Sequence, residues 1–280
     1  MNARAIALTG LALVAFAGNS LLCRASLARH EIDPAAFTVI RIASGALVLM
    51  LLARGSGQAL WRRTTLVSAA ALFLYAAPFS YAYVRLGAGV GALVLFGAVQ
   101  ATMLGAAVAR GERLRPLAWL GWGIAMGGLA ILTVPGATAP DIFGVALMAA
   151  AGFSWGVYSL RAAKETAPPL AVTAASFVGC LPIAAALAGA EAAAGRLHVT
   201  TQGAAFAVAS GAITSGLGYA VWHAALRRIT APEAAIAQLL VPMIAAAAGI
   251  FLLGEAMTSR LALAGAFIVS GVLLALRTRR

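Results

Sequence analysis

The chain has 280 residues, of which 62% are hydrophobic and 10% are charged, and its mean hydropathy is +0.96. Soluble domains carry about 25% charged residues, so this composition excludes a soluble enzyme or repressor and predicts a protein that folds in a lipid bilayer. The net charge of +12 would indicate nucleic-acid binding only if the basic residues gathered on one solvated surface.

Ten apolar stretches are each close to the ~20 residues with which a helix crosses a bilayer. In chain order they cover residues 5–23, 35–53, 64–84, 89–109, 117–134, 142–160, 170–189, 203–223, 232–253 and 261–276. Their short connections predict antiparallel neighbours and no separate soluble domain. The first stretch also resembles a signal peptide, because Arg4 precedes it and residues 15–17 (Ala-Phe-Ala) look like a cleavage site. The internal repeat described below favours its retention as a helix.

Short polar residues at the breaks between stretches predict helix caps. Asp33 with Pro34 opens the second helix, Asp141 opens the sixth, and Thr166 is expected to cap the seventh. Residues 230–233 (Thr-Ala-Pro-Glu) form a capping-box pattern before the ninth. Capping explains most of the acidic residues without a catalytic role.

The distribution of Lys and Arg predicts how the protein is oriented in its membrane. With the N-terminus in the cytoplasm, 14 basic residues fall on the inner side, five fall on the outer side, and Arg41 lies within a helix. Both termini are therefore expected inside, in a bacterial inner (plasma) membrane that the chain crosses many times. The positive charge is a topology signal, so we expect a lipid bilayer and no nucleic acid as a partner.

The two halves of the sequence repeat one another. A shift of 134 residues places Gly10, Gly18, Ser20, Pro34 and Gly45 on Gly144, Gly152, Ser154, Pro168 and Gly179. Further along, a shift of 143 places residues 111–112 (Gly-Glu) on residues 254–255. Five helices per half put the second copy upside down, so we expect two inverted repeats, residues 1–136 and 137–280. Inverted repeats are typical of transporters that work by alternating access.

Ten helices, two inverted five-helix halves and a Gly-Glu pair before the last helix of each half resemble the drug/metabolite transporter superfamily, and within it the EamA-type exporters. Pro34 with Arg41 in the second helix, and Pro242 ahead of residues 254–255, are similar to that family's pattern. In the first half, residues 99–100 (Val-Gln) replace the proline equivalent to Pro242. The finer likeness is to the YddG-type amino-acid exporters. The resemblance implies export of small metabolites through a cavity lined mainly by the first, third, fourth, sixth, eighth and ninth helices.

Charge inside the predicted spans is scarce. No Asp, Glu or Lys lies in the middle of a stretch, and the polar residues of the first helix, Asn19 and Ser20, cannot exchange a proton for a cationic drug. Arg41 lies ~9 Å along the second helix from its outer end. An intramembrane charge indicates a functional residue by default, whereas the family resemblance favours a structural Arg41. His223, at the inner end of the eighth helix, is a candidate for proton coupling or an interfacial residue.

Aromatic residues mark one face on each of three predicted helices. They are Tyr75, Phe79 and Tyr83 on the third helix, Trp155 and Tyr158 with Ser159 on the sixth, and Tyr219 and Trp222 on the eighth. Helical spacing puts each set on a single face, and such faces line cavities for amphipathic metabolites. Helix packing and the interfacial aromatic belt are the competing explanations.

Two amides and two prolines complete the candidate site. Gln100 and Gln238 lie on the fourth and ninth helices, where each needs a hydrogen-bond partner from a neighbouring helix or a substrate. Pro78 and Pro242 lie inside helices, where each removes a backbone hydrogen bond and bends the helix. They are candidates for gating or for static kinks.

The predicted function is export of amino acids or similar small metabolites by a secondary transporter that uses no ATP, cofactor or metal. An intramembrane enzyme is disfavoured, because Ser210 and His223 are 13 residues apart on one helix, which is too far for a catalytic pair. A carrier of nucleotide sugars, lipids or drugs from the same superfamily would have the same architecture. Phosphate-bearing substrates would require several inward cations, and Arg41 alone qualifies. A monomer or a weak homo-oligomer is expected.

Overall fold

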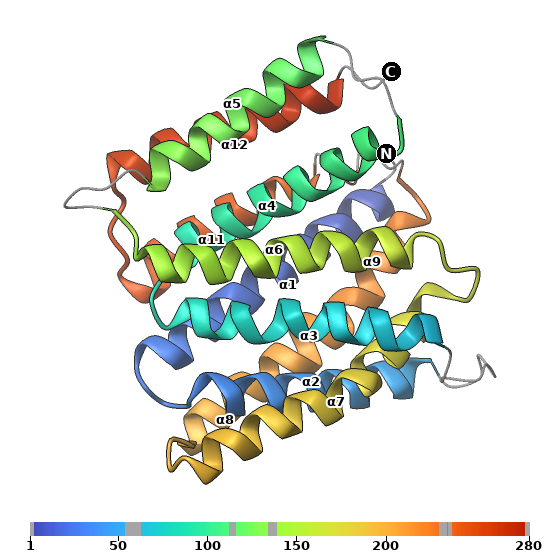
Figure 1. The fold of residues 1–280 in the computed structure, drawn as a ribbon, viewed down its shortest axis with the longest axis vertical. Helices are drawn as coiled ribbons and strands as arrows, with labels where there is room; N and C mark the ends of the chain where they lie inside the picture. The colour runs from blue at the N-terminus through green and yellow to red at the C-terminus, as the bar shows by residue number, and fades with distance from the viewer. Residues whose placement is uncertain are drawn as a thin grey trace.

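The computed structural model of the chain is a bundle of helices (Figure 1). It describes residues 3–53, 63–111, 116–133, 139–229, 234 and 237–277. The helices are α1 (Ala3–Ala28), α2 (Pro34–Leu52), α3 (Arg63–Tyr83), α4 (Ala88–Ala109), α5 (Pro116–Thr133), α6 (Ile142–Ala162), α7 (Pro169–Ala193), α8 (Thr201–Ala209), the π-helix η1 (Ser210–Leu217), α9 (Gly218–Leu226), α11 (Leu240–Leu253) and α12 (Ser259–Arg277). Over these residues the β-structure is confined to one isolated bridge between Ile32 and Val199.

Seven helical segments are long and apolar enough to cross a membrane, the continuous stretch Thr201–Leu226 (α8, η1 and α9) counting as one. Shorter apolar helices, at Pro116–Leu132, Leu240–Leu253 and Ser259–Ala275, complete the set. The ten predicted helices are thus confirmed in the described part of the chain, which is an all-α membrane protein. Large apolar side chains on the outer surface, such as Phe251 at 85% exposure, suit contact with lipid rather than with water.

The starts of two helices confirm the predicted cap chemistry. Asp33 accepts hydrogen bonds of 2.9 Å from two amides in the first turn of α2, and Asp141 accepts one of 2.7 Å in the first turn of α6. The prediction for Thr166 is wrong, because α7 begins with the pair Pro168–Pro169. Proline has the φ of a helix start and no amide hydrogen that requires a cap. The predicted capping box at 230–233 lies outside the described residues.

The predicted eighth helix, 203–223, contains a π-helical segment, η1, that was not expected. Gly211 allows η1 to pack tightly on α2, because a Cβ there would collide with the Arg41 carbonyl oxygen and with Ser44 Oγ. Within η1, Thr214 Oγ1 donates a 2.7 Å hydrogen bond to the carbonyl oxygen of Ser210. Single π turns inside α-helices often occur at functional sites, and this one contributes to the cavity described below.

Helices that are far apart in the sequence pair across the two halves of the chain (Figure 1). α2 packs on α7, α4 on α11, and α5 on α12, and this last pair lies at one edge of the bundle. α3 packs on α6, while α8, η1 and α9 pack on α1. α1 begins and α12 ends at the same end of the bundle, on the right of Figure 1. The interior between α1, α3, α6 and η1 is therefore enclosed by both halves.

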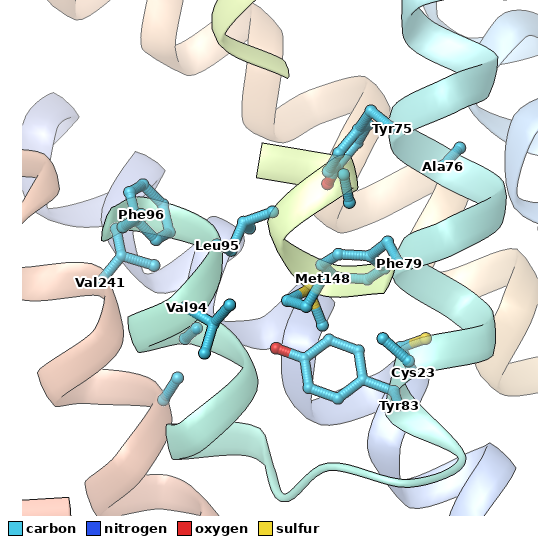
Figure 2. Close-up of a cluster of buried hydrophobic side chains, with 14 of the residues drawn as sticks. Cys23, Tyr75, Ala76, Phe79, Tyr83, Val94, Leu95, Phe96, Met148 and Val241 are labelled. Atoms are coloured by element: carbon cyan, nitrogen blue, oxygen red, sulfur yellow. The ribbon is translucent and has the colours of Figure 1, made fainter. Parts of the chain in front are cut away.

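A row of aromatic side chains runs along α3 inside this interior. Figure 2 shows Tyr75, Phe79 and Tyr83 in succession along the helix, directed toward α4 and α6. Val94 of α4 and Met148 of α6 belong to the same buried cluster. The predicted aromatic face of the third helix is therefore turned into the bundle and away from lipid.

Candidate functional site

A cavity of about 410 Å³ lies inside the bundle and takes its walls from both halves of the chain. α1, α3 and α4 line it from the first half, and α6, η1, α9, Ala234 and Gln238 line it from the second. At one end the lining reaches the exposed residues Arg110, Ala163 and Leu226. We call this end the mouth. It lies on the side of the bundle where α1 begins and α12 ends (Figure 1).

Six aromatic side chains form a continuous part of the lining, which we call the aromatic wall: Phe16, Tyr75, Phe79, Trp155, Tyr219 and Trp222. The ring centroids of Tyr75 and Trp155 are 4.9 Å apart, and those of Trp155 and Tyr219 are 5.5 Å apart. Phe16 lies 5.9 Å from Tyr219 and thereby adds α1 to the wall. Tilted rings at these separations attract one another, so the wall is a cohesive surface for the apolar part of a ligand.

Neutral polar groups accompany the wall at the end of the cavity opposite the mouth, the inner end. Asn19 Oδ1 accepts a 2.6 Å hydrogen bond from Ser210 Oγ, and Asn19 Nδ2 donates to the Tyr75 hydroxyl at 3.4 Å. The second contact is long for a hydrogen bond, so a ligand can compete for both groups. Of the described lining residues, Arg110 at the mouth is the one with a charged side chain.

Most of the residues predicted to line a cavity are found together around this one. Ten of the thirteen line it: Asn19, Ser20, Tyr75, Phe79, Gln100, Trp155, Ser159, Tyr219, Trp222 and Gln238. Trp222 is 8% exposed, so it belongs to the interior and not to the interfacial aromatic belt. Pro78 in α3 and Pro242 in α11 lie within their helices as predicted but outside the lining.

Tyr83 and Tyr158 support the aromatic wall from outside the cavity. Tyr83 is fully buried, and its ring stands edge-on to Phe79 with 4.7 Å between centroids. Tyr158 lies 5.4 Å from Trp155 and is 4% exposed. Both side chains are therefore placed to hold wall residues in position, and neither lies in the belt at the membrane surface.

Arg41 and His223 also lie outside the lining. Arg41 is 2% exposed and is covered by the rings of Tyr75 and Phe79. The His223 Nε2 atom lies 3.1 Å from Thr173 Oγ1 on α7, whereas Ser210 is engaged with Asn19 on α1. Ser210 and His223 thus have separate partners, as expected for two residues that do not form a catalytic pair.

The lining also contains residues that were not predicted, among them Phe16, Phe96, Thr214 and Ser215. Phe16 is three residues before Asn19, so helical periodicity around that polar residue could have identified it. Phe96 is four residues before Gln100, so the same periodicity could have identified it as well. The positions of Thr214 and Ser215 depend on η1, because a π-helical segment changes which residues face inward.

Beyond the inner end, a network centred on Glu255 joins the two halves of the chain. Both Glu255 carboxylate oxygens lie 2.9 Å from the amide nitrogen of Ala88, the first residue of α4. Arg24 Nε donates to Glu255 Oε1 at 3.3 Å, and Arg24 Nη1 donates to the carbonyl oxygens of Tyr83 and Val84 at 2.9 and 3.2 Å. We call these five residues the latch. A carboxylate at a helix N-terminus and beside a guanidinium is stabilised by both.

Glycines shape the backbone around the latch. Gly254 ends α11 in the left-handed region, with φ 70°, and places Glu255 beside α4. Gly249 leaves space for the carboxylate, because a Cβ there would lie 2.6 Å from Glu255 Oε2. Ala88 begins α4 and Arg110 follows its last residue, so the latch and the mouth lie at opposite ends of one helix, ~33 Å apart at 1.5 Å per residue.

Comparison with known proteins agrees with this architecture. Residues 142–277 match the EamA-like transporter family. The chain is 48% identical over 286 residues to an uncharacterized protein of Pseudomonas aeruginosa, covering 99% of this chain and 96% of that protein. A crystal structure of a protein matches 100% of both chains with a TM-score of 0.69 and 21% identity, which is a likeness of fold.

Proposed function

We propose that this chain, which belongs to the EamA-like transporter family, is a secondary transporter that exports amino acids or similar small metabolites across a bacterial inner membrane. The observation that carries the proposal is the cavity between the two halves, which reaches one end of the bundle and is separated from the other end by the latch. A cavity of this form receives a solute from one side at a time, as alternating access requires.

The packing supports two inverted repeats, residues 1–136 and 137–280. In such a repeat α1 corresponds to α6, and α3 corresponds to η1 and α9. The contact of α3 with α6 then has its counterpart in the contact of η1 and α9 with α1. The pairs α2–α7, α4–α11 and α5–α12 each join two corresponding helices. A shift of 143 residues relates Gly128 to Gly271 and Gly121 to Ala264. A Cβ on Gly271 would collide with the carbonyl oxygen of Gly121. A Cβ on Gly128 would lie 2.9 Å from the carbonyl oxygen of Ala264. Reciprocal contacts of this kind are typical of a twofold axis.

The basic residues supply the orientation. Those at the mouth end, among the described residues, are Arg4, Arg63, Arg110, Arg161, Lys164, Arg227, Arg228 and Arg277, and those at the latch end are Arg24, Arg29, Arg85, Arg196 and Arg260. With the excess of positive charge in the cytoplasm, both termini and the mouth face the cytoplasm. The structure then corresponds to the state that loads substrate from inside. Export requires the mouth to close and the latch to open.

The lining supports small solutes without a large net charge. A volume of about 410 Å³ is within the range of small-molecule sites. Nucleotide sugars and other phosphate-bearing substrates need several cations around the phosphate, whereas the described lining contributes Arg110 alone, at the mouth. Cationic drugs would require a carboxylate, and none occurs among the described lining residues. Zwitterionic amino acids fit this chemistry best.

Counterflow in proteoliposomes tests the proposal. Vesicles with the purified protein are loaded with one unlabelled amino acid, and entry of the same radiolabelled compound is followed across a panel of amino acids. We expect accelerated exchange for at least one small neutral amino acid, relative to protein-free vesicles. Exchange of nucleotide sugars or organic cations in place of any amino acid would contradict the substrate class. A complete lack of exchange would contradict transport of these solutes.

A further inference from the structure

Arg41 is a charged side chain with an unusual position. It is the largest of the fully buried side chains, and it approaches the cavity from behind the aromatic wall. Its guanidinium carbon lies 5.1 Å from the ring centroid of Tyr75 and 4.9 Å from that of Phe79. Both rings line the cavity, so a layer one ring thick separates this charge from a bound solute.

The hydrogen-bonding capacity of Arg41 is not fully used. Its Nε and Nη1 atoms are buried without a hydrogen-bond partner. The ion pairs found among the described residues join Arg24 to Glu255, Arg85 to Asp141 and Arg196 to Glu191, and do not include Arg41. Burial of an unpaired charge is strongly unfavourable, and two cation–π contacts offset part of that penalty. Because arginine cannot lose its proton in proteins, the charge persists at this position.

We propose that Arg41 is a positioning residue that makes the inner end of the cavity select for a carboxylate. This inference rests on the proposed transport function. Arg41 generates a positive potential on the cavity side of Tyr75 and Phe79, where the carboxylate of a zwitterion is held and the ammonium of an organic cation is repelled. The charge acts through the aromatic rings and does not contact the substrate.

The groups at the inner end suit a carboxylate in this potential. Asn19 Nδ2 donates to the Tyr75 hydroxyl over a long 3.4 Å, so this amide hydrogen and the hydroxyl hydrogen of Tyr75 are the two donors that can turn to a carboxylate oxygen. Coulomb's law over about 9 Å, with an effective dielectric constant of about 20, predicts roughly a tenfold preference for a zwitterion over a cation of the same shape. The opposite end of the cavity carries its charged residue, Arg110, on the exposed surface, where water screens it.

Three ligands that share the leucine side chain, of which one carries a carboxylate, test the inference. Binding of radiolabelled leucine to purified protein in nanodiscs is measured by scintillation proximity, with competition by leucinamide and by isoamylamine. For the wild type we expect leucine to bind about ten times more tightly than either cation. Arg41→Gln and Arg41→Met should reduce this ratio to about one, and Arg41→Lys should retain most of it. Arg110→Gln, which removes the same charge at the mouth, should leave the ratio unchanged.

A purely structural role for Arg41 predicts a different pattern. Its variants would then weaken the binding of all three ligands equally and leave the affinity ratio at its wild-type value, which overturns the inference.

A second test keeps Arg41 in place: Ser20→Asp adds a negative charge to the lining and should reverse the preference toward leucinamide. An unchanged preference in that variant also overturns the inference. If the wild type binds all three ligands equally, the inference about Arg41 is wrong and the proposed substrate class still stands. If the wild type binds none of them, the proposed substrate class is contradicted as well.

Discussion

The two ends of the cavity are built from different interactions. At the latch, Glu255 and Arg24 join the two halves through directional hydrogen bonds with an amide and two carbonyl oxygens. At the mouth, the described lining ends in the exposed side chains of Arg110, Ala163 and Leu226. The hydrogen bonds of the latch share one carboxylate and one guanidinium, so they are expected to form and break together. The latch is therefore suited to closing its end of the cavity in an all-or-none way, whereas the mouth is suited to the entry of solute.

The largest effect is expected for Glu255→Gln, which removes the charge shared by Arg24 and the N-terminus of α4. Loss of one charge-assisted hydrogen bond of about 1.5–3 kcal/mol should raise opening of the latch end roughly ten- to a hundredfold. The reporter is Ser20→Cys, with Cys23 and Cys180 replaced by alanine, labelled in intact cells with a membrane-impermeant maleimide. Glu191→Gln is the matched control, because it removes an acid whose partners, Arg196 and Tyr81, lie outside the latch. Equal labelling of the two variants would rule out the latch as the closure.

A smaller effect on the same end is expected for Gly249→Ala. The added Cβ would lie 2.6 Å from Glu255 Oε2, so the carboxylate must move away from Ala88. Labelling of Ser20→Cys from outside should increase about threefold, corresponding to less than 1 kcal/mol. Gly97→Ala is the control, since a Cβ on Gly97 meets no atom within 4 Å. If both substitutions leave labelling at the wild-type level, the carboxylate is not confined as described.

Substitutions in the cavity should change selectivity and leave the latch closed. Trp155→Ala removes a ring that joins Tyr75 to Tyr219, and Gln100→Ala removes an amide from the lining. We expect each to alter the ranking of amino acids in counterflow by about two- to fivefold, because an aromatic contact contributes about 1 kcal/mol. Trp119→Ala, on the lipid-facing side of α5 at 46% exposure, should preserve the ranking. An unchanged ranking in both cavity variants would assign these residues to packing.

The smallest effect is expected for His223, which lies outside the lining. In the first of the two roles that the sequence suggests for it, proton coupling, His223→Gln should remove any stimulation of export by a pH gradient and leave exchange at equal pH within about twofold of the wild type. Counterflow with and without a pH gradient measures both quantities. Stimulation that persists in the variant would limit His223 to its contact with Thr173.

Sequence patterns were sufficient for the helices and for most of the cavity, because the membrane imposes a simple length and polarity on each span. Aromatic faces at helical spacing identified Tyr75, Trp155 and Tyr219, which meet in one wall. Sequence patterns were insufficient where tertiary packing decides. The π-helical segment η1 packs closely on α2, and the partners of Glu255 come from distant parts of the chain. The burial of Arg41 behind two rings likewise depends on how α2 and α3 meet.

The central claim is that one cavity opens to the two sides of the membrane in turn. Labelling of Ser20→Cys from each side, in intact cells and in inside-out vesicles, tests it most directly. Without substrate we predict labelling mainly from the cytoplasmic side, through the mouth. Saturating amounts of a transported amino acid should raise labelling from outside and lower it from the cytoplasm. Labelling that rises from both sides together would indicate an open channel, and labelling that never appears from outside would contradict alternating access.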